Sequence, residues 1–182
     1  LIAGFGEVVK YGFIADERIL EIIEANPGVA VDPISAEFLE IVTRCITIKA
    51  RVVANDFREA GEREILNYGH TLGHAIELAE RFKWRHGAAV SVGMMFVAEL
   101  SRLAGSASDA LVERHRSVLN LLGLPTGYEL RKWEELLSAM QRDKKSRSGA
   151  LRFVVLDDIA KPRILTSPAP ELMHAAYLEI CG

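Results

Sequence analysis

Residues 86–98 read "HGAAVSVGMMFVA", the longest stretch of the chain without a charged side chain. The stretch is too short and too rich in small side chains to span a bilayer, which takes about 20 apolar residues. It is typical of a helix that is buried inside a protein. We therefore expect a buried helix over residues 87–104.

The sequence on both sides of this helix is mostly helical in its periodicity, with apolar side chains recurring every three or four residues. Residues 62–83 are expected to form one helix, and the other expected helices cover residues 6–14, 16–26, 33–53, 108–123, 131–145 and 169–182. The one convincing strand pair is "LRFVVLDD" with "KPRIL", a small hairpin within residues 151–165. The predicted fold is mostly α: a single multi-helix domain over residues 1–182 with a small β-hairpin.

The composition limits the classes of function. The chain has 182 residues, of which 49% are apolar and 26% charged, as in ordinary globular domains. Its formal net charge of −3 gives no general attraction to nucleic acid or to anionic membranes. Its two cysteines are too few for a disulfide framework, which favours a reducing compartment. We expect a cytoplasmic protein.

Polar side chains gather in residues 58–77, "REAGEREILNYGHTLGHAIE". His70 and His74 are four residues apart and share a helix face, as in two-histidine metal sites. The glutamate of the H-E-x-x-H motif is absent, however, and surface pairs with this spacing are common. A catalytic metal site needs a third protein ligand, for which His86 and Glu7 are candidates. Glu7 would equally suit a charge at the N-terminus of a helix.

Further polar residues are spaced so that they would share a helix face with Glu7 or with His70. Lys10 follows Glu7 by about one helical turn and can pair with it. Arg63, Asn67 and His70 are four and three residues apart, so one side of the predicted helix would carry all three. A cation, an amide and a potential ligand in a row suit a phosphorylated or carboxylated substrate that is rich in hydroxyl groups.

Two other features have both a functional and a structural interpretation. Lys49 lies on the same stripe of its predicted helix as Ile46 and Val52. A lysine on an apolar face is costly unless it is paired or lines a pocket, and the alternative is a snorkelling stem at the edge of the core. The basic run "RDKKSR", residues 142–147, suits either a solvated loop or a phosphate contact.

Four motifs give the chain a resemblance to a known family: "GFGEVVKYGFI", "IKARVVANDFREAGEREILNYGHTLGHAIE", "WRHGAAVSVGM" and "RDKKSRSGALRFVVL". In this order they resemble the C-terminal domain of 3-dehydroquinate synthase, in the form that actinobacteria have, over essentially the whole chain. The family converts 3-deoxy-D-arabino-heptulosonate 7-phosphate to 3-dehydroquinate in the shikimate pathway of aromatic amino acid biosynthesis. It uses a divalent metal ion and a catalytic NAD.

The resemblance implies a role for each candidate. It makes Glu7, His70 and His86 the metal ligands and gives His74 a separate task, proton transfer near the substrate phosphate. The resemblance also implies that the substrate is contacted by Lys10, Lys49, Arg63 and Asn67. Glu59 would accept a proton from the substrate. Lys145, in preference to Lys144, would make a further contact with the substrate. Because zinc binds neutral imidazole, activity is expected to fall on acidification.

The resemblance also implies cofactors and partners. The metal would be Zn²⁺ or Co²⁺, and NAD would be bound mainly by an N-terminal α/β domain. The 182 residues hold no G-x-G-x-x-G motif, so we expect that domain to be absent from this chain and the isolated chain to lack turnover. A homodimer is expected for the full-length enzyme.

Two alternatives compete with this interpretation. Related sugar-phosphate cyclases of the valiolone or aminocyclitol type use the same scaffold and metal ligands, although Arg63, Asn67 and the string "LNYGHTLGHAIE" favour dehydroquinate synthase. A non-catalytic helical domain that holds a structural metal is the second alternative. It predicts a metal shell that is fully closed by protein ligands.

Overall fold

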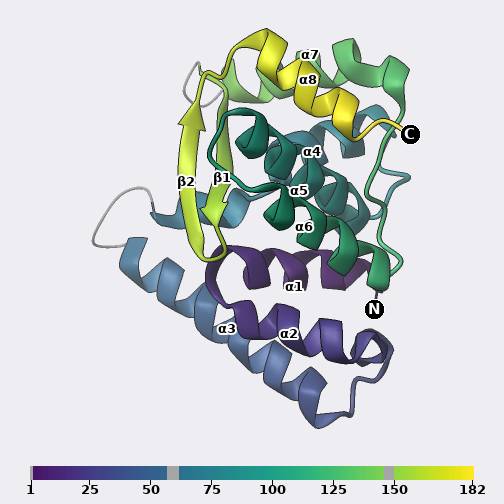
Figure 1. Cartoon of the computed structure of the whole chain (residues 1–182), viewed down its shortest axis with the longest axis vertical. Coiled ribbons are helices and arrows are strands. Elements are labelled where there is room, and N and C mark those ends of the chain that lie inside the picture. Colours follow the sequence, from purple (N-terminus) through teal and green to yellow (C-terminus); the bar gives the residue numbers. More distant parts are fainter. Residues whose placement is uncertain (1, 57–61, 146–149) are drawn as a thin grey trace.

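The computed structural model describes residues 2–56, 62–145 and 150–182, and at positions 55, 56, 62 and 143–145 it describes the backbone alone. Over these residues the chain forms eight α-helices, three short 3₁₀ helices and one β-hairpin (Figure 1). The elements are α1 (Ile2–Ala15), α2 (Glu17–Ala25), η1 (Pro27–Val31), α3 (Ala36–Asp56), η2 (Glu62–Asn67), α4 (His70–Ala79), α5 (His86–Leu103), α6 (Asp109–Leu121), η3 (Leu130–Lys132), α7 (Trp133–Lys145), β1 (Arg152–Asp158), β2 (Lys161–Thr166) and α8 (Pro170–Glu179). The prediction of a mostly helical fold with one small hairpin is confirmed.

Helix α5 is the centre of the fold. Every residue from Ala89 to Ser101 is buried, and the helix contacts α1, α4, α6, α8 and β1. Figure 1 shows α7 and α8 across one end of this arrangement and α1, α2 and α3 across the other. The buried helix predicted over 87–104 is therefore confirmed, with bounds shifted by one residue. Among the described helices none is long and apolar enough to cross a membrane.

The hairpin closes one side of the helical layer around α5. Strands β1 and β2 pair in antiparallel register, with Phe153 opposite Leu165 and Val155 opposite Arg163. Residues 153–156 are buried because β1 lies against α5, and the Ser101 hydroxyl of α5 donates a hydrogen bond of 2.7 Å to the carbonyl oxygen of Leu156. The predicted strand pair is confirmed.

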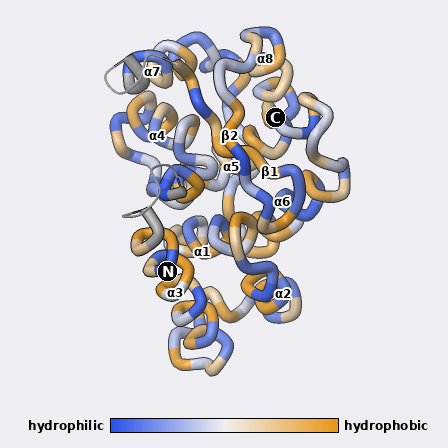
Figure 2. Tube along the Cα trace, turned by 90° about the vertical axis from the view of Figure 1, so that its left-hand side faces the viewer, coloured by the Kyte–Doolittle hydropathy of each residue, from blue (hydrophilic) through white to orange (hydrophobic). Residues whose placement is uncertain are grey.

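Helix α3 buries only part of the stripe that the sequence suggested, since Val52 is buried and Ile46 is not. It begins at Ala36, three residues later than predicted, and Ser35 caps it by accepting a hydrogen bond from the backbone N–H of Phe38. The buried side chains of α3 are Ile41, Ile48 and Val52, whereas Ile46 is 64% exposed. The helix is amphipathic, as the alternating colours along α2 and α3 show in Figure 2. Lys49 therefore does not lie on the apolar stripe.

The single helix predicted over 62–83 is wrong, because the chain turns at Gly69. A 3₁₀ segment ends at Asn67, and Gly69 has a φ of 76°, in the left-handed region that favours glycine. Helix α4 then starts at His70 in a new direction and ends at Ala79. Two further residues with positive φ, Arg81 at 52° and Phe82 at 58°, follow in the turn toward α5. Arg63 and Asn67 thus lie on a different element from the histidines.

Candidate active site

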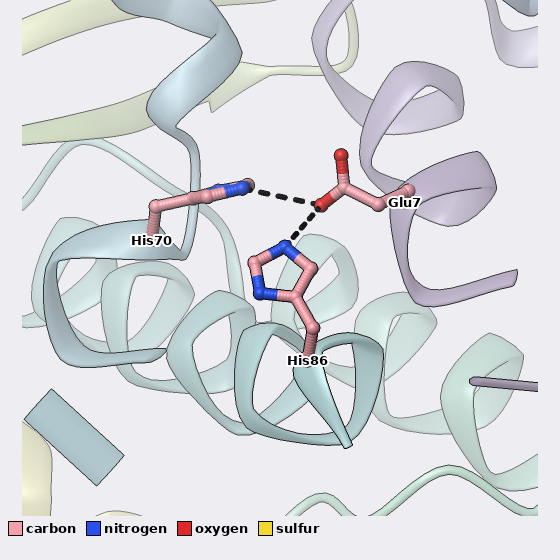
Figure 3. A group of neighbouring side chains, drawn as sticks. All are labelled: Glu7, His70 and His86. Atoms are coloured by element: carbon pink, nitrogen blue, oxygen red, sulfur yellow. Dashed lines mark ion pairs between the residues drawn. The ribbon is translucent and has the colours of Figure 1, made fainter. Parts of the chain in front are cut away.

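Three side chains from three helices meet at one carboxylate oxygen (Figure 3). Glu7 projects from α1, His70 opens α4 and His86 opens α5. The Nε2 atoms of His70 and His86 lie 3.2 and 3.5 Å from the Oε1 atom of Glu7. The three residues that the family resemblance implied as ligands are therefore brought together, although 79 residues separate the first from the last in sequence.

Glycine backbones allow the three helices to approach this closely. A Cβ atom on Gly87, the residue after His86, would overlap the carbonyl oxygen of Ala3 in α1. A Cβ on Gly93 would likewise overlap the carbonyl oxygen of Gly69, the residue before His70. Both contacts are to backbone atoms, which cannot swing aside as a flexible side chain can. The small residues of the "HGAAVSVG" segment therefore set the spacing of the site.

Each histidine ring is oriented by a hydrogen bond at its second nitrogen. The Nδ1 atom of His70 lies 3.0 Å from the carbonyl oxygen of Tyr68, and the Nδ1 atom of His86 lies 3.1 Å from the Oε1 atom of Glu77. A carbonyl or carboxylate oxygen can only accept, so both rings carry their proton on Nδ1. The Nε2 lone pairs then point toward Glu7, and this is the tautomer that a metal ligand needs.

Glu7 is held as a carboxylate. Its Oε2 atom lies 2.7 Å from the Nζ atom of Lys10, whose side chain is 3% exposed. Burial opposes ionisation of Glu7, whereas the charge of Lys10 and its hydrogen bond lower the pKa of Glu7 and favour the carboxylate. Burial in turn lowers the pKa of Lys10, while the charge of Glu7 acts against that change.

The donor set fits a divalent metal ion. The Oε1 atom of Glu7 is buried and accepts no hydrogen bond from the described residues. It faces two imidazole lone pairs, so three electron-pair donors point at one place without a proton between them, an arrangement that a cation would stabilise. Zinc bonds of about 2.0–2.1 Å give a tetrahedron with edges of about 3.3–3.4 Å, close to the two measured separations.

A polar cavity of about 460 Å³ opens beside these donors. Six residues that were predicted for the site line it: Glu7, Lys10, Lys49, Arg63, Asn67 and His70. Lys49, Arg63 and Asn67 are exposed, so their polar groups are free to meet a ligand from solution. The interpretation of Lys49 as a pocket residue is supported over that of a snorkelling core residue. Tyr11, Glu64 and Leu66 also line the cavity and were missed.

An ion pair with the hairpin anchors the segment that carries Arg63 and Asn67. Glu64 of η2 accepts two hydrogen bonds from the guanidinium of Arg152 in β1, at 2.8 and 2.7 Å. Two parallel bonds fix orientation as well as distance. The cavity wall formed by η2 is thus positioned by β1, which sequence spacing alone gave no means of finding.

A buried pair supports the turn below His70. The hydroxyl of Tyr68 lies 2.8 Å from the Nε2 atom of His115, and the Nδ1–H of His115 donates to the carbonyl oxygen of Leu111 at 2.7 Å. The ring of Phe13 stacks on His115. Burial is the main cause that lowers the pKa of His115, to about 4, so this histidine is neutral. It is a core residue that holds Tyr68, and Tyr68 orients His70.

Of the remaining predicted site residues, the structure describes His74 but not the side chains of the others. His74 is exposed, with its ring centroid 5.3 Å from that of His70, so the two histidines share a face as expected. One of its ring nitrogens lies within 4.8 Å of a donor atom of Glu77 and of His86, which makes a second group of potential ligands. Glu59 lies outside the described residues, and so do the side chains of Lys144 and Lys145.

The fold places the chain in a structural class that it shares with two solved synthases. The 2-epi-5-epi-valiolone synthase of Streptomyces hygroscopicus, solved with NAD⁺ and Zn²⁺ bound, matches 98% of this chain and 50% of its own with a TM-score of 0.88 at 20% identity. A 2-deoxy-scyllo-inosose synthase, solved with carbaglucose-6-phosphate, NAD⁺ and Co²⁺, matches 97% of this chain and 52% of its own with a TM-score of 0.79 at 26% identity.

The chain belongs to the family described as 3-dehydroquinate synthase C-terminal, whose model matches residues 4–146. Proteins named 3-dehydroquinate synthase are 63% identical in Leifsonia xyli and 59% identical in an Arthrobacter species, each over all 182 residues. One from Rhodococcus erythropolis is 57% identical over 180 residues. The chain spans about half the length of these curated relatives, 49–51% in the three cases.

Proposed function

We propose that the protein to which this chain belongs converts 3-deoxy-D-arabino-heptulosonate 7-phosphate to 3-dehydroquinate and phosphate, a carbon–oxygen lyase reaction. The observation that carries the proposal is the meeting of Glu7, His70 and His86 at the wall of a cavity that also presents Lys49 and Arg63. A metal-ligand set beside two exposed cations suits a substrate with hydroxyl, carboxylate and phosphate groups. The identity of 56–63% to proteins named 3-dehydroquinate synthase supports this choice within the class.

The ligands of the metal are proposed to be Glu7, His70 and His86, and the metal Zn²⁺ or Co²⁺. A carboxylate and two imidazoles are a typical set for catalytic zinc, which leaves one position open to the substrate. A metal ion bound there would orient the reacting hydroxyl groups and polarise the oxygen that is oxidised. The donor set is open toward the cavity. A structural metal site would instead be closed by protein ligands, so this alternative is disfavoured.

The cations of the cavity are proposed to neutralise the substrate. Lys49 and Arg63 would bind its phosphate and carboxylate, because a charge-assisted hydrogen bond is about twice as strong as a neutral one. Asn67 would bind a hydroxyl group through its amide. Lys10 has a double task, since it also stabilises the ionised form of Glu7. Lys145 is proposed as a further contact with the substrate.

Protons are proposed to move through His74 and Glu59. His74 is exposed one turn after His70, so it reaches the solvent side of the donor set without being one of the three converging donors. It would hold the proton near the departing phosphate, while Glu59 would accept a proton from the substrate. This division of labour gives the two histidines of "HTLGH" different roles.

NAD is proposed to supply the transient oxidation and re-reduction, and to be bound mainly by an α/β domain outside these 182 residues. The two solved relatives named above contain NAD⁺, and each is about twice as long as this chain. We propose that the enzyme acts in the cytoplasm as a homodimer, and that the isolated 182 residues lack turnover.

Product analysis tests the proposed function. The full-length enzyme is incubated with NAD, Zn²⁺ and the heptulosonate phosphate, and the products are identified by NMR. We expect 3-dehydroquinate and inorganic phosphate. A valiolone-type product from another sugar phosphate, with no dehydroquinate, would favour the alternative cyclases. The isolated 182 residues serve as the comparison, and clear turnover by them would overturn the assignment of NAD binding to another domain.

A further inference from the structure

We infer that Glu77 is a positioning residue for the metal centre: it fixes the ring of His86 and strengthens His86 as a ligand. This inference rests on the proposed function, because it takes Glu7, His70 and His86 as the metal ligands. It adds a residue that contacts neither the substrate cavity nor the converging point of the donors. Glu77 acts through His86 alone.

The side chain of His86 approaches Glu7 and lies beside the rings of His70 and His74, and one hydrogen bond to a described residue fixes the direction of its ring. It is 45% exposed, and it is the first residue of α5, directly after a turn that contains the positive-φ residues Arg81 and Phe82. A half-exposed side chain at a helix start samples several rotamers unless a partner fixes it. The described contact that fixes the ring is the 3.1 Å hydrogen bond from Nδ1–H to the Oε1 atom of Glu77.

Glu77 is well placed to act as this partner. It follows His70 by seven residues, two turns of α4, so both residues lie on the same face of the helix. Its side chain is only 14% exposed, which limits the competition from water for the carboxylate. Helix α4 thus carries one ligand of the proposed metal and the residue that orients a second ligand from α5.

The two histidines are oriented by acceptors of different charge. His70 uses the neutral carbonyl oxygen of Tyr68, and His86 uses an anionic carboxylate. A carboxylate on Nδ1–H pushes electron density toward Nε2 and makes that nitrogen a stronger donor to a metal ion. Loss of such an outer partner typically weakens metal binding 10–100-fold. His86, the more exposed of the two proposed histidine ligands, therefore depends on the side chain of Glu77 for its strength as a metal donor.

The competing role for Glu77 is that of a metal ligand in its own right. Donor atoms of His74, Glu77 and His86 also lie within 4.8 Å of one another, so this group could hold a second cation. In that case the Nδ1 atom of His86 would carry no proton and would bind metal. The two roles predict different numbers of bound ions, one for a positioning residue and two for a ligand.

Zinc titration against a chromophoric chelator separates these roles. The proteins are the full-length enzyme, its Glu77→Gln and Glu77→Ala variants, and Glu80→Gln as a matched control at the residue that ends α4. Glu80 accepts a hydrogen bond from the hydroxyl of Tyr128 and is not among the grouped donors. Urea unfolding of each protein shows whether the fold is retained.

The expected result is one zinc ion per chain, with a Kd that rises about 10–100-fold in Glu77→Ala and less in Glu77→Gln, which keeps an acceptor but loses the charge. Glu80→Gln should match the wild type. With Co²⁺, the visible absorption bands should shift in the Glu77 variants and stay unchanged in the control.

Other outcomes contradict specific steps. A wild type that binds no zinc would overturn the proposed function itself. One tight zinc that is indifferent to both Glu77 substitutions would overturn this inference and leave the proposed function standing. Two zinc ions in the wild type, with one lost in Glu77→Ala, would make Glu77 a ligand instead of a positioning residue.

Discussion

The α-carbon of Gly93 faces the carbonyl oxygen of Gly69 so closely that no side chain fits between them. This contact sets the distance between α5 and the start of α4, and with it the distance between His86 and His70. Gly69 also needs its positive φ to redirect the chain into α4. The geometry of the candidate metal centre therefore depends on two residues that have no functional group.

Substituting Gly93 by alanine should destabilise the fold. The added Cβ would overlap backbone atoms, so α4 and α5 must move apart, and overpacking of this kind costs about 1–3 kcal/mol or more. Urea unfolding measures the loss. Gly4→Ala on α1 is the control, because no atom of the described residues lies within 4 Å of its Cβ position, and it should cause no loss. A Gly93→Ala protein as stable as the wild type would contradict the account of helix spacing.

Substituting each of the paired histidines should separate metal binding from proton transfer. His70→Ala removes a proposed ligand, so zinc affinity should fall by more than the roughly 100-fold that loss of an outer partner can cause. His74→Ala should keep its zinc and lose turnover in the full-length enzyme. Zinc content and product formation are measured on both variants. Loss of zinc from His74→Ala would show that the histidine pair acts as one clamp.

Lys49 and Lys10 should respond differently to truncation. Lys49 is exposed, so Lys49→Ala should change the unfolding free energy by less than about 0.5 kcal/mol. It should lower kcat/KM of the full-length enzyme about 10–100-fold, the worth of one hydrogen bond to a charged group. Lys10→Ala should destabilise the fold itself, because it leaves the Glu7 carboxylate without its buried cation. Unchanged kcat/KM in Lys49→Ala would remove Lys49 from the site.

His115 should make the fold sensitive to acid between about pH 6.5 and pH 4. The pKa of His115 is lowered from 6.5 to about 4, mainly by burial, so in this range the unfolded chain binds a proton that the folded chain does not. Stability from this residue is present above pH 6.5 and is lost as pH falls, by about 3 kcal/mol in total. Unfolding free energies measured at several pH values test this.

The control for this pH dependence is His115→Gln, which keeps polar atoms near Tyr68 and cannot be protonated in this range. Its stability at pH 7 should be lower than that of the wild type, because the packing with Phe13 is lost. Its slope with pH between 6.5 and 4 should be flatter. An equal slope in both proteins would assign the acid sensitivity to other groups.

The sequence predicted the elements whose signals are local. The uncharged run at 86–98 marked the buried helix α5, and the alternating strands with their turn marked the hairpin. The helix predicted over 62–83 failed at Gly69, since apolar periodicity continued across a residue whose left-handed backbone ends one element and starts another. The sequence signal for this break was Gly69, a glycine directly before the histidine pair.

The sequence predicted which residues could form the candidate site, but not how they would be arranged in space. Motif resemblance implied that Glu7, His70 and His86 act together, whereas spacing alone favoured the pair of His70 and His74, because the approach of Glu7 depends on how α1 packs against α5. Lys49 was expected on the buried stripe of α3 beside Ile46 and Val52, but of these three only Val52 is buried, together with Ile41 and Ile48. The role of Glu77 could not be predicted from the sequence, because its contact with His86 depends on the turn between α4 and α5.

The central claim is that Glu7, His70 and His86 form one metal centre. Crystals of the protein grown with Zn²⁺ should be measured at the zinc absorption edge, where anomalous scattering locates the ion directly. We expect one anomalous peak, within bonding distance of the Oε1 atom of Glu7 and the Nε2 atoms of His70 and His86. A peak that contacts His74 and Glu77 while leaving Glu7 unbound would contradict the claim.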